Sequence, residues 1–403
     1  MNIDEQVTLL MQGTEYGDDD LAFFMADQLR KRLIKSSKEK RPLRVYCGYD
    51  PTSSDLHLGH TITMRKLRQF QDLGHDVTFL IGSYTALVGD PSDKNKARPI
   101  LSQEQIAVNS QTYADQAFRV LDKKKTTIRY NGEWLSELGL VDLIRMGQHF
   151  TIQQFLVRDN FSKRMESNEP IFLHETFYAL MQGYDAVAMQ ADVQVGGTDQ
   201  LFNIIVAGRK LQEALGQEPL VGIICGILPG TDGVQRMSKT TGNVIPINTD
   251  PADMYGKLMS IPDESIIKYY RLSSSLGPSE IDDIEKNLLS GKEHPRDVKM
   301  NLAFEITSIF YGEKYAKDGK KAFINLFQKG KQPEVMEEID VFPGESILDI
   351  ISRTKLVSSK SEGRRLINQN GIRFEGEIIN DIKFKPESGV LQIGKRKFVK
   401  LKF

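Results

Sequence analysis

Residues 45–60 read V-Y-C-G-Y-D-P-T-S-S-D-L-H-L-G-H, and this stretch decides how the fold of the chain is interpreted. Apolar residues alternate with polar ones up to Cys47, which predicts a strand that ends at Gly48. Further on, apolar residues recur every three or four positions as far as Gly74, which predicts a helix that this glycine ends. A second strand is expected at 76–81. The stretch therefore predicts a strand, a polar loop, a helix and a strand, in that order.

The entrance of this predicted helix is rich in polar groups. A helix N-terminus presents unpaired N–H groups and a partial positive charge, and it therefore attracts phosphate. His57 and His60 are three residues apart and share one face of the first turn. Gly59 lies between them and leaves room for a flat ligand to approach the backbone. Taken alone, the two histidines fit a ligand site and an ordinary helix end equally well.

The overall composition is that of a globular protein with more than one domain. The chain has 403 residues, of which 27% are charged and 40% hydrophobic. No apolar run approaches the roughly 18 residues that a membrane span needs. The acidic start of the chain lacks the order of a signal or transit peptide. Cys47 and Cys225 both lie in apolar runs, which favours free thiols in a reducing cytoplasm, so we expect a cytoplasmic protein without a metal site.

Charge is distributed unevenly along the chain. Residues 344–403 carry 13 basic and 7 acidic residues, a net charge of +6, whereas the total for the chain is −1. The remainder therefore carries −7. A basic tail on an acidic body indicates that the tail contacts a polyanion, although a merely soluble basic surface is the simpler interpretation.

Strands that alternate with helices continue to about residue 130 and predict a parallel, doubly wound sheet. Ligands of such sheets bind at the carboxyl ends of the strands, where the loops at 48–52 and 82–91 are expected. Tyr178, Gln182 and Asp185 recur at helical spacing and share one face. Such a polar stripe is more often a solvated face than a binding site.

Two further glycine-rich segments suit phosphates or hydroxyls. Gly196-Gly197-Thr198-Asp199-Gln200 joins a predicted strand to a helix, although Asp199 would also serve as a simple helix cap. The segment 226–242 contains four glycines around Arg236-Met237-Ser238-Lys239-Thr240. Glycines around two cations are typical of a mobile loop that closes over phosphates, and an ordinary basic surface loop is the alternative.

These pieces together resemble the class I aminoacyl-tRNA synthetases. His57-Leu58-Gly59-His60 resembles their HIGH motif, and Arg236-Met237-Ser238-Lys239-Thr240 resembles their KMSKS motif with changes at the first and last positions. The two motifs have the expected order and lie about 180 residues apart. The segments at 46–52, 89–92, 178–185 and 196–200 resemble the bacterial type of tyrosyl-tRNA synthetase, and 344–403 resembles its S4-type RNA-binding module.

The resemblance implies a doubly wound parallel-sheet (Rossmann-like) α/β catalytic domain, then a helical domain, then a small α+β S4-like RNA-binding domain. We expect residues 1–32 to form an N-terminal helical segment and 33–228 the catalytic domain, with a connective insertion at about 131–175. We expect the RMSKT loop and helical domain at 229–330, a linker at 331–343 and the S4-like domain at 344–403.

The resemblance also implies an activity, which is tyrosine–tRNA ligation by a homodimer. The enzyme would activate L-tyrosine with ATP, with Mg²⁺ carried on the ATP phosphates, and transfer the tyrosyl group to tyrosine tRNA. The attacking carboxylate is already ionised, so catalysis would rest on positioning and on stabilisation of phosphate charge. Two alternatives stay open: a tryptophan-specific relative, and a non-catalytic RNA-binding protein on the same fold.

The site residues implied by the resemblance fall into four groups. The catalytic group contains Thr52, His57, His60, Arg236 and Lys239. The tyrosine-binding group contains Tyr46, Asp90, Tyr178, Gln182, Asp185 and Gln200. The ATP-binding group contains Cys47, Gly48, Asp50, Gly59, Gly197, Asp199, Met237, Ser238 and again Lys239. The candidate RNA-binding group contains Arg158, Lys163, Arg164, Lys360, Arg364 and Arg365.

Overall fold

A computed structural model describes residues 1–51, 56–91, 102–238, 241–325, 336–354, 356–357, 359–394 and 397–402. The chain forms two units: Met1–Thr249 with Lys257–Gly312, and Asp250–Gly256 with Glu313–Phe403. The helices at 257–312 therefore belong to the same unit as residues 1–249, whereas the sequence predicted a loop and helical domain at 229–330.

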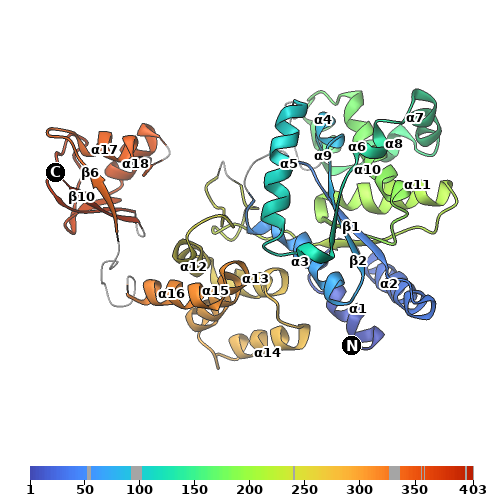
Figure 1. Cartoon of the computed structure of the whole chain (residues 1–403), viewed down its shortest axis with the longest axis horizontal. Coiled ribbons are helices and arrows are strands. Elements are labelled where there is room, and N and C mark those ends of the chain that lie inside the picture. Colours follow the sequence, from blue (N-terminus) through green and yellow to red (C-terminus); the bar gives the residue numbers. More distant parts are fainter. Residues whose placement is uncertain are drawn as a thin grey trace. The chain divides into compact units, whose positions relative to one another are not determined.

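The elements of the first unit are labelled in Figure 1. In chain order they are α1 (Ile3–Met11), α2 (Asp19–Glu39), β1 (Arg44–Tyr49), η1 (Leu58–His60), α3 (Thr61–Asp72), β2 (Asp76–Ile81), α4 (Thr85–Val88), α5 (Gln103–Ala117), η2 (Lys123–Lys125), β3 (Thr126–Tyr130), α6 (Gly132–Leu135), α7 (Leu140–Gly147), α8 (Ile152–Leu156), α9 (Asp159–Glu166), α10 (Leu173–Ala188), β4 (Val193–Gly197), η3 (Thr198–Gln200), the π-helical segment η4 (Phe202–Gly208), α11 (Arg209–Ala214), β5 (Val221–Cys225), η5 (Asp263–Ser265), α13 (Ile266–Ser273), α14 (Pro278–Leu289) and α15 (Pro295–Tyr311). Helix α12 (Pro251–Met259) has residues in both units.

The sheet of this unit is parallel, and its strand order is β3-β2-β1-β4-β5. The chain moves outward from β1 to β3 and then returns to place β4 on the other side of β1. This reversal leaves a crevice at the carboxyl ends of β1 and β4, which is the usual ligand position in such sheets. Helix α3 packs on β1, β2 and β4. The predicted doubly wound fold is confirmed.

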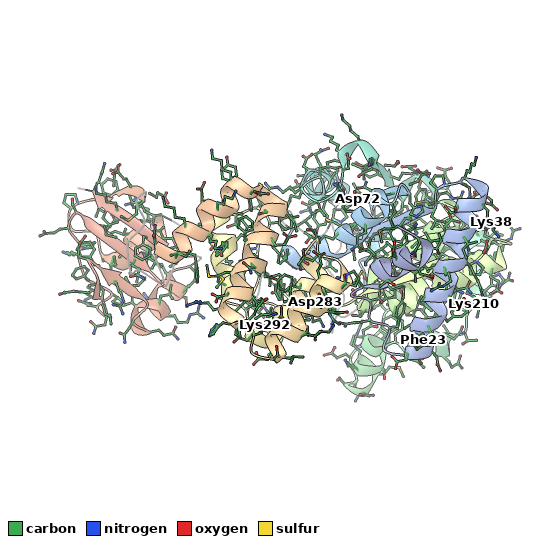
Figure 2. All side chains as sticks on the ribbon, turned by 90° about the horizontal axis from the view of Figure 1, so that it is seen from below. Phe23, Lys38, Asp72, Lys210, Asp283 and Lys292 are labelled. Carbon is green, nitrogen blue, oxygen red and sulfur yellow. The ribbon has the colours of Figure 1, made fainter. Side chains whose placement is uncertain are left out.

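Asp192, just before β4, ties the N-terminal helix α2 to the sheet. Its carboxylate contacts Arg32 of α2 at 3.2 Å and Arg41 at 2.8 Å, and it accepts the backbone N–H of Arg44 at 2.8 Å. Arg32 and Asp192 are both at most 5% exposed. Phe23 of α2 lies on the opposite, outward side of this helix (Figure 2) and is 76% exposed. Arg32 therefore lies on the buried side of α2, together with Met25, Leu29 and Leu33.

The second unit contains α16 (Glu313–Phe323), β6 (Glu337–Asp340), α17 (Ile347–Arg353), α18 (Lys360–Asn368), β7 (Ile372–Phe374), β8 (Glu377–Ile378), β9 (Gly389–Ile393) and β10 (Lys397–Lys402). Its strands form a mixed sheet in the order β6-β10-β9-β7-β8, and one apolar core packs the sheet against α17 and α18. The predicted small α+β domain is confirmed.

The expected linker at 331–343 needs a correction. Its residues 337–340 are strand β6, which pairs in parallel with β10 at the end of the described chain. Residues 331–335 lie outside the described part. Among the described helices, none combines the length and the apolar character needed to cross a bilayer.

Candidate functional site

The crevice at the carboxyl ends of β1 and β4 opens into a cavity of about 810 Å³. Its lining comes from the ends of β1 and β4, from η1 and α3, from one face of α10 and from the segment after β5. Sixteen of the sequence-predicted residues line it: Cys47, Gly48, Asp50, His57, Gly59, His60, Asp90, Tyr178, Gln182, Asp185, Gly197, Asp199, Gln200, Arg236, Met237 and Ser238. Thr52 and Lys239 lie outside the described residues.

The two histidines lie in a tight turn that leads into α3. His57 donates its backbone N–H to Nδ1 of His60 at 3.2 Å, and the two rings lie 3.8 Å apart between centroids. The turn is a 3₁₀ turn, in which residues three apart eclipse each other. A Cβ at Gly59 would lie 3.1 Å from the His57 ring and 3.8 Å from Sδ of Met237. The predicted shared face of the two histidines is confirmed.

The segment after Arg236-Met237-Ser238 returns to the histidine turn and pairs with it. Leu58 donates its backbone N–H to the carbonyl of Ile245 at 2.8 Å, and Ile247 donates to the carbonyl of Leu56 at 3.3 Å. His57 and Pro246 form the antiparallel bridge between these bonds. Two segments that are far apart in the sequence are therefore joined through their backbones beside one cavity.

Asp185 of α10 is a buried residue in the cavity lining. It is 3% exposed and accepts hydrogen bonds from Nε1 of Trp134 at 2.8 Å and from Nδ2 of Asn131 at 3.3 Å. Burial raises the pKa of Asp185 to about 8, although the two donors act against this shift. Tyr46 is 1% exposed, and burial together with the nearby Asp185 carboxylate raises its pKa. Its hydroxyl has no hydrogen-bond partner among the described residues.

Asp50 is the centre of a second group of hydrogen bonds. It accepts Oγ1 of Thr85 at 2.7 Å and the hydroxyl of Tyr178 at 2.9 Å. Asn131 donates to Thr85 at 3.0 Å and so links this group to Asp185. A side chain at Gly82 would collide with Asp50 and Thr85, which explains the glycine at this position. Asp50, which was predicted to bind the nucleotide, therefore accepts a hydrogen bond from Tyr178, which was predicted to bind the amino acid.

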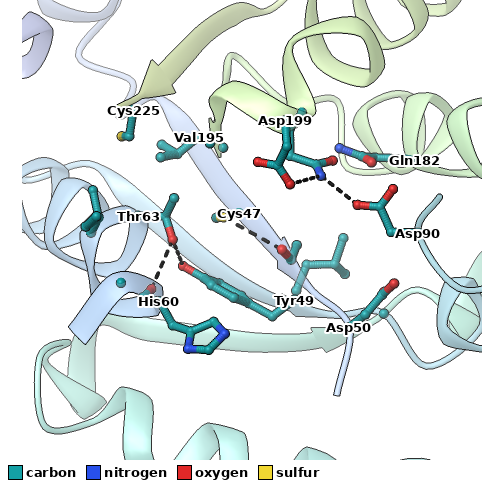
Figure 3. A pocket seen from close by; sticks show the side chains of 18 of the residues that line it. Cys47, Tyr49, Asp50, His60, Thr63, Asp90, Gln182, Val195, Asp199 and Cys225 are labelled. Atoms are coloured by element: carbon teal, nitrogen blue, oxygen red, sulfur yellow. Dashed lines mark hydrogen bonds between the residues drawn. The ribbon is translucent and has the colours of Figure 1, made fainter. Parts of the chain in front are cut away.

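A third group of hydrogen bonds contains four predicted residues and one that the sequence did not reveal. Gln200 donates Nε2 to Asp90 at 2.6 Å and to Asp199 at 3.0 Å, as Figure 3 shows. Asn203, which is fully buried in η4, donates Nδ2 to Gln182 at 2.9 Å and to Gln200 at 3.0 Å. The π-helical turn at η4 places this side chain beside the cavity, a common position for such turns.

Hydroxyl and thiol groups line another wall of the cavity (Figure 3). The Tyr49 ring stacks on Phe79 at 4.3 Å, and its hydroxyl lies 2.9 Å from Oγ1 of Thr63. Burial raises the pKa of the Cys47 thiol to about 12, so it is neutral near pH 7. A neutral thiol is a hydrogen-bonding group and a poor nucleophile. Cys47 therefore suits contact with a ligand rather than covalent chemistry.

Sequence reasoning missed Trp134, Asn131, Thr85, Asn203, Tyr49 and Thr63. Trp134 is the single tryptophan of the chain and follows Asn131-Gly132 at the carboxyl end of β3. That position, at the ligand edge of a parallel sheet, was an available signal. Asn203 and Thr63 carried no comparable signal, because their partners are distant in the sequence.

Two candidate RNA-binding residues need a correction. Arg158 is 6% exposed, and its guanidinium lies between the rings of Phe161 and Phe202, 5.1 and 5.0 Å from their centroids. Arg164 is 2% exposed and pairs with the equally buried Glu175 at 2.6 Å. Because neither guanidinium reaches the surface, neither is placed to contact a nucleic-acid phosphate.

The other four candidates lie at the surface. Lys163 of α9 is exposed. In the second unit, Lys360 is 62% exposed and contacts Asp349 at 3.0 Å, and Arg364 and Arg365 are exposed on α18.

The raised pKa of Asp185 predicts a loss of stability as pH rises. An aspartate in an unfolded chain ionises near pH 4, whereas Asp185 in the folded protein ionises near pH 8. Between these values the folded state binds more protons, so the free energy of unfolding falls by up to about 1.4 kcal/mol per pH unit. Asp185→Asn removes this loss. The urea midpoint of Asp185→Asn minus that of the wild type should increase from about pH 5 to pH 8 and stay constant above pH 8.

The matched control for that experiment is Asp283→Asn, at an outward-pointing side chain on α14 that is 75% exposed (Figure 2). A difference in urea midpoint between Asp185→Asn and the wild type that is the same at pH 5 and at pH 8 would contradict the raised pKa of Asp185.

Comparisons with known proteins agree with this geometry. The family model described as tRNA synthetases class I (W and Y) matches residues 38–328. The tyrosine–tRNA ligase of Thermotoga maritima is 47% identical over 92% of this chain and 93% of its own length. The tyrosine–tRNA ligase of Desulfotalea psychrophila is 42% identical over 100% of this chain and 99% of its own.

Among solved structures, a C-terminally truncated mitochondrial tyrosyl-tRNA synthetase of Aspergillus nidulans aligns with a TM-score of 0.62 at 23% identity. The alignment covers 81% of this chain and 93% of that one, which supports the fold. A cavity at the reversal point of a parallel sheet, two joined signature segments and relatives of this identity lead to one conclusion: the chain belongs to the class I aminoacyl-tRNA synthetases, in the family of the tyrosine–tRNA ligases.

Proposed function

We propose that this chain activates L-tyrosine with ATP and transfers the tyrosyl group to the 3′ end of tyrosine tRNA. The observation that carries the proposal is buried Asp185 in the cavity lining, which accepts hydrogen bonds from Trp134 and Asn131. The unpaired buried hydroxyl of Tyr46 lies close to this carboxylate. These two groups suit a ligand that both donates and accepts a hydrogen bond.

A phenolic hydroxyl meets that requirement, because its O–H donates to Asp185 while its oxygen accepts from Tyr46. A ligand without the hydroxyl leaves the Tyr46 hydroxyl unpaired in a buried place, at a cost of about 1–3 kcal/mol. It also leaves Asp185 with only the hydrogen bonds from Trp134 and Asn131. Tyrosyl-tRNA synthetases are themselves the usual illustration of this kind of discrimination. The same reasoning disfavours tryptophan, whose indole donates a hydrogen bond and accepts none.

Activation joins a carboxylate oxygen of tyrosine to the α-phosphorus of ATP and breaks the bond from that phosphorus to the bridging oxygen of pyrophosphate. ATP enters as its magnesium complex, with the ion on the phosphates. No proton has to be removed from the nucleophile, so the chain needs to orient the reactants and stabilise the phosphate charge. The imidazoles, hydroxyls and cations around the cavity suit that task.

The proposed positions of the substrates rest on the resemblance of the motifs, and the hydrogen-bonded groups support part of them. Asp90, Tyr178, Gln182 and Gln200 would hold the ammonium and carboxylate of tyrosine. Cys47, Gly48, Gly59, Gly197 and Asp199 would contact the adenosine, with Asp50 between the two substrates. Thr52, His57, Arg236 and Lys239 would act on the phosphates, and His60 would lie with Gly59 against the adenosine. Met237 and Ser238 would place the two cations.

The direct test is pyrophosphate exchange into ATP. We expect exchange with tyrosine and none with tryptophan. Lys239→Ala should slow exchange by about 10²–10³, the usual loss for one contact to transition-state charge, while tyrosine binding stays unchanged. Lys286→Ala, 75% exposed on α14, is the control and should keep the wild-type rate.

Two results would contradict this account. Exchange that tryptophan supports would reject the assignment of Asp185 and Tyr46. The absence of exchange with both amino acids would indicate a non-catalytic RNA-binding protein.

We also propose that the S4-like domain contributes to tRNA binding. Its basic charge and the exposed Arg364 and Arg365 on α18 support this. The double variant Arg364→Ala/Arg365→Ala should weaken tRNA charging and reduce its dependence on salt, because each phosphate contact releases counterions. Tyrosine-dependent exchange should stay at the wild-type rate, and the exposed Lys31→Ala on α2 should change neither activity. Equal loss of both activities would mean that the two arginines act on the fold.

A homodimer is the third part of the proposal. On α7, Leu140, Val141 and Ile144 share one side, and each is more than half exposed. Adjacent exposed apolar residues of this kind mark an interaction surface. Val141→Glu should convert the dimer to a monomer in light scattering, whereas Leu289→Glu, at an 83% exposed leucine on α14, should not. A Val141→Glu protein that stays dimeric would place the interface elsewhere.

A cytoplasmic location, which two buried free thiols support, belongs to the same proposal.

A further inference from the structure

One side chain, Asn243, holds together the described part of the segment that carries Arg236 and Ser238. It is 5% exposed. Its Oδ1 accepts the backbone N–H of Ser238 at 2.8 Å and Oγ1 of Thr241 at 2.7 Å. Its Nδ2 donates to Asp232 at 2.7 Å and to the carbonyls of Arg236 at 3.1 Å and Gln235 at 3.3 Å.

This set of partners requires an asparagine. The backbone N–H of Ser238 can only donate, and the carbonyl of Arg236 can only accept, so the amide orientation is fixed by its surroundings. An aspartate has no donor for the carbonyl and would face Asp232 with like charge. A leucine of similar size has neither donor nor acceptor.

The surrounding backbone is built closely around this amide. A side chain at Gly230 would collide with Asn243. The carbonyl of Asn243 accepts the N–H of Thr231 at 3.0 Å, and Asp232 in turn accepts the N–H groups of Val234 and Gln235, each at 3.0 Å. The amide therefore connects both ends of the 230–243 segment.

Arg236 and Ser238 line the cavity, and Asn243 is two residues before Ile245, whose carbonyl binds the histidine turn. Asn243 itself does not line the cavity among the described residues. It is thus placed to set the position of groups that reach the ligand without touching the ligand itself.

We propose, on the basis of the function proposed above, that Asn243 is a positioning residue for the activation step. Its amide holds Arg236 and Ser238 at the phosphate end of the cavity, in register with His57 and His60. The amino acid subsite at Asp185 is made by other elements, namely α10 and the end of β3. Loss of the amide therefore affects the rate of activation and leaves tyrosine binding intact.

The test is steady-state pyrophosphate exchange with the full-length protein, with tyrosine binding measured separately by equilibrium dialysis. Asn243→Ala should lower kcat by about 10–100-fold, the range expected when reacting groups shift by about 1 Å. The KM for tyrosine and its dissociation constant should change by less than about twofold. Asn248→Ala is the matched control, at an exposed asparagine in the same connection, and should keep the wild-type kcat.

A pair of charge variants separates positioning from folding. Asn243→Asp places two carboxylates together and should lose activity at least as strongly as Asn243→Ala. The double variant Asp232→Asn/Asn243→Asp restores the hydrogen bond between the two side chains and should recover part of kcat. Thermal midpoints of all variants are recorded alongside.

The outcomes are distinct. A kcat for Asn243→Ala within twofold of the wild type overturns the inference, as does a parallel loss of kcat, tyrosine binding and thermal midpoint without recovery in the double variant. If the wild-type protein shows no tyrosine-dependent exchange, the proposed function is overturned instead. Exchange by the wild type is therefore measured before any variant is compared.

Discussion

The backbone hydrogen bond from Leu58 to Ile245 is the contact on which the site depends. It joins the turn that carries His57 and His60 to the segment that follows Arg236 and Ser238. Without it, the side of the cavity that carries Arg236 and Ser238 would not be held against the histidine turn. The reversal of strand order between β1 and β4 places these parts at one edge of the sheet, and the hydrogen bond fixes their distance.

Within that frame, the chemistry is divided between two kinds of environment. The side chains at Asp185 are buried, and the Tyr46 hydroxyl has no hydrogen-bond partner among the described residues, which would suit a bound hydroxyl. Elsewhere the described lining contains two imidazoles, backbone groups and the guanidinium of Arg236, which suit a ligand with several negative charges. An enzyme that activates a carboxylate with a nucleotide needs both environments side by side, and it needs no nucleophile of its own.

The sequence predicted the parts that depend on local pattern. The strand, loop and helix from Leu43 to Leu73 follow from alternation, spacing and the stop at Gly74, and the parallel sheet follows from the alternation of strands and helices. Motif spacing and resemblance were sufficient to find 16 of the 33 residues that line the cavity. What failed depended on distant partners. Strand β6 exists only because β10 pairs with it, and Arg158 is buried because Phe202 covers it.

The most direct test of the account is a crystal structure with a non-hydrolysable analogue of tyrosyl-adenylate. The account predicts the phenolic oxygen within hydrogen-bond distance of Asp185 and Tyr46, and the ribose beside Gly197 and Asp199. It also predicts the phosphate mimic between His57 and Arg236, with the bond from Leu58 to Ile245 intact. An analogue bound in the reverse direction, or a broken Leu58–Ile245 bond in the occupied site, would contradict it.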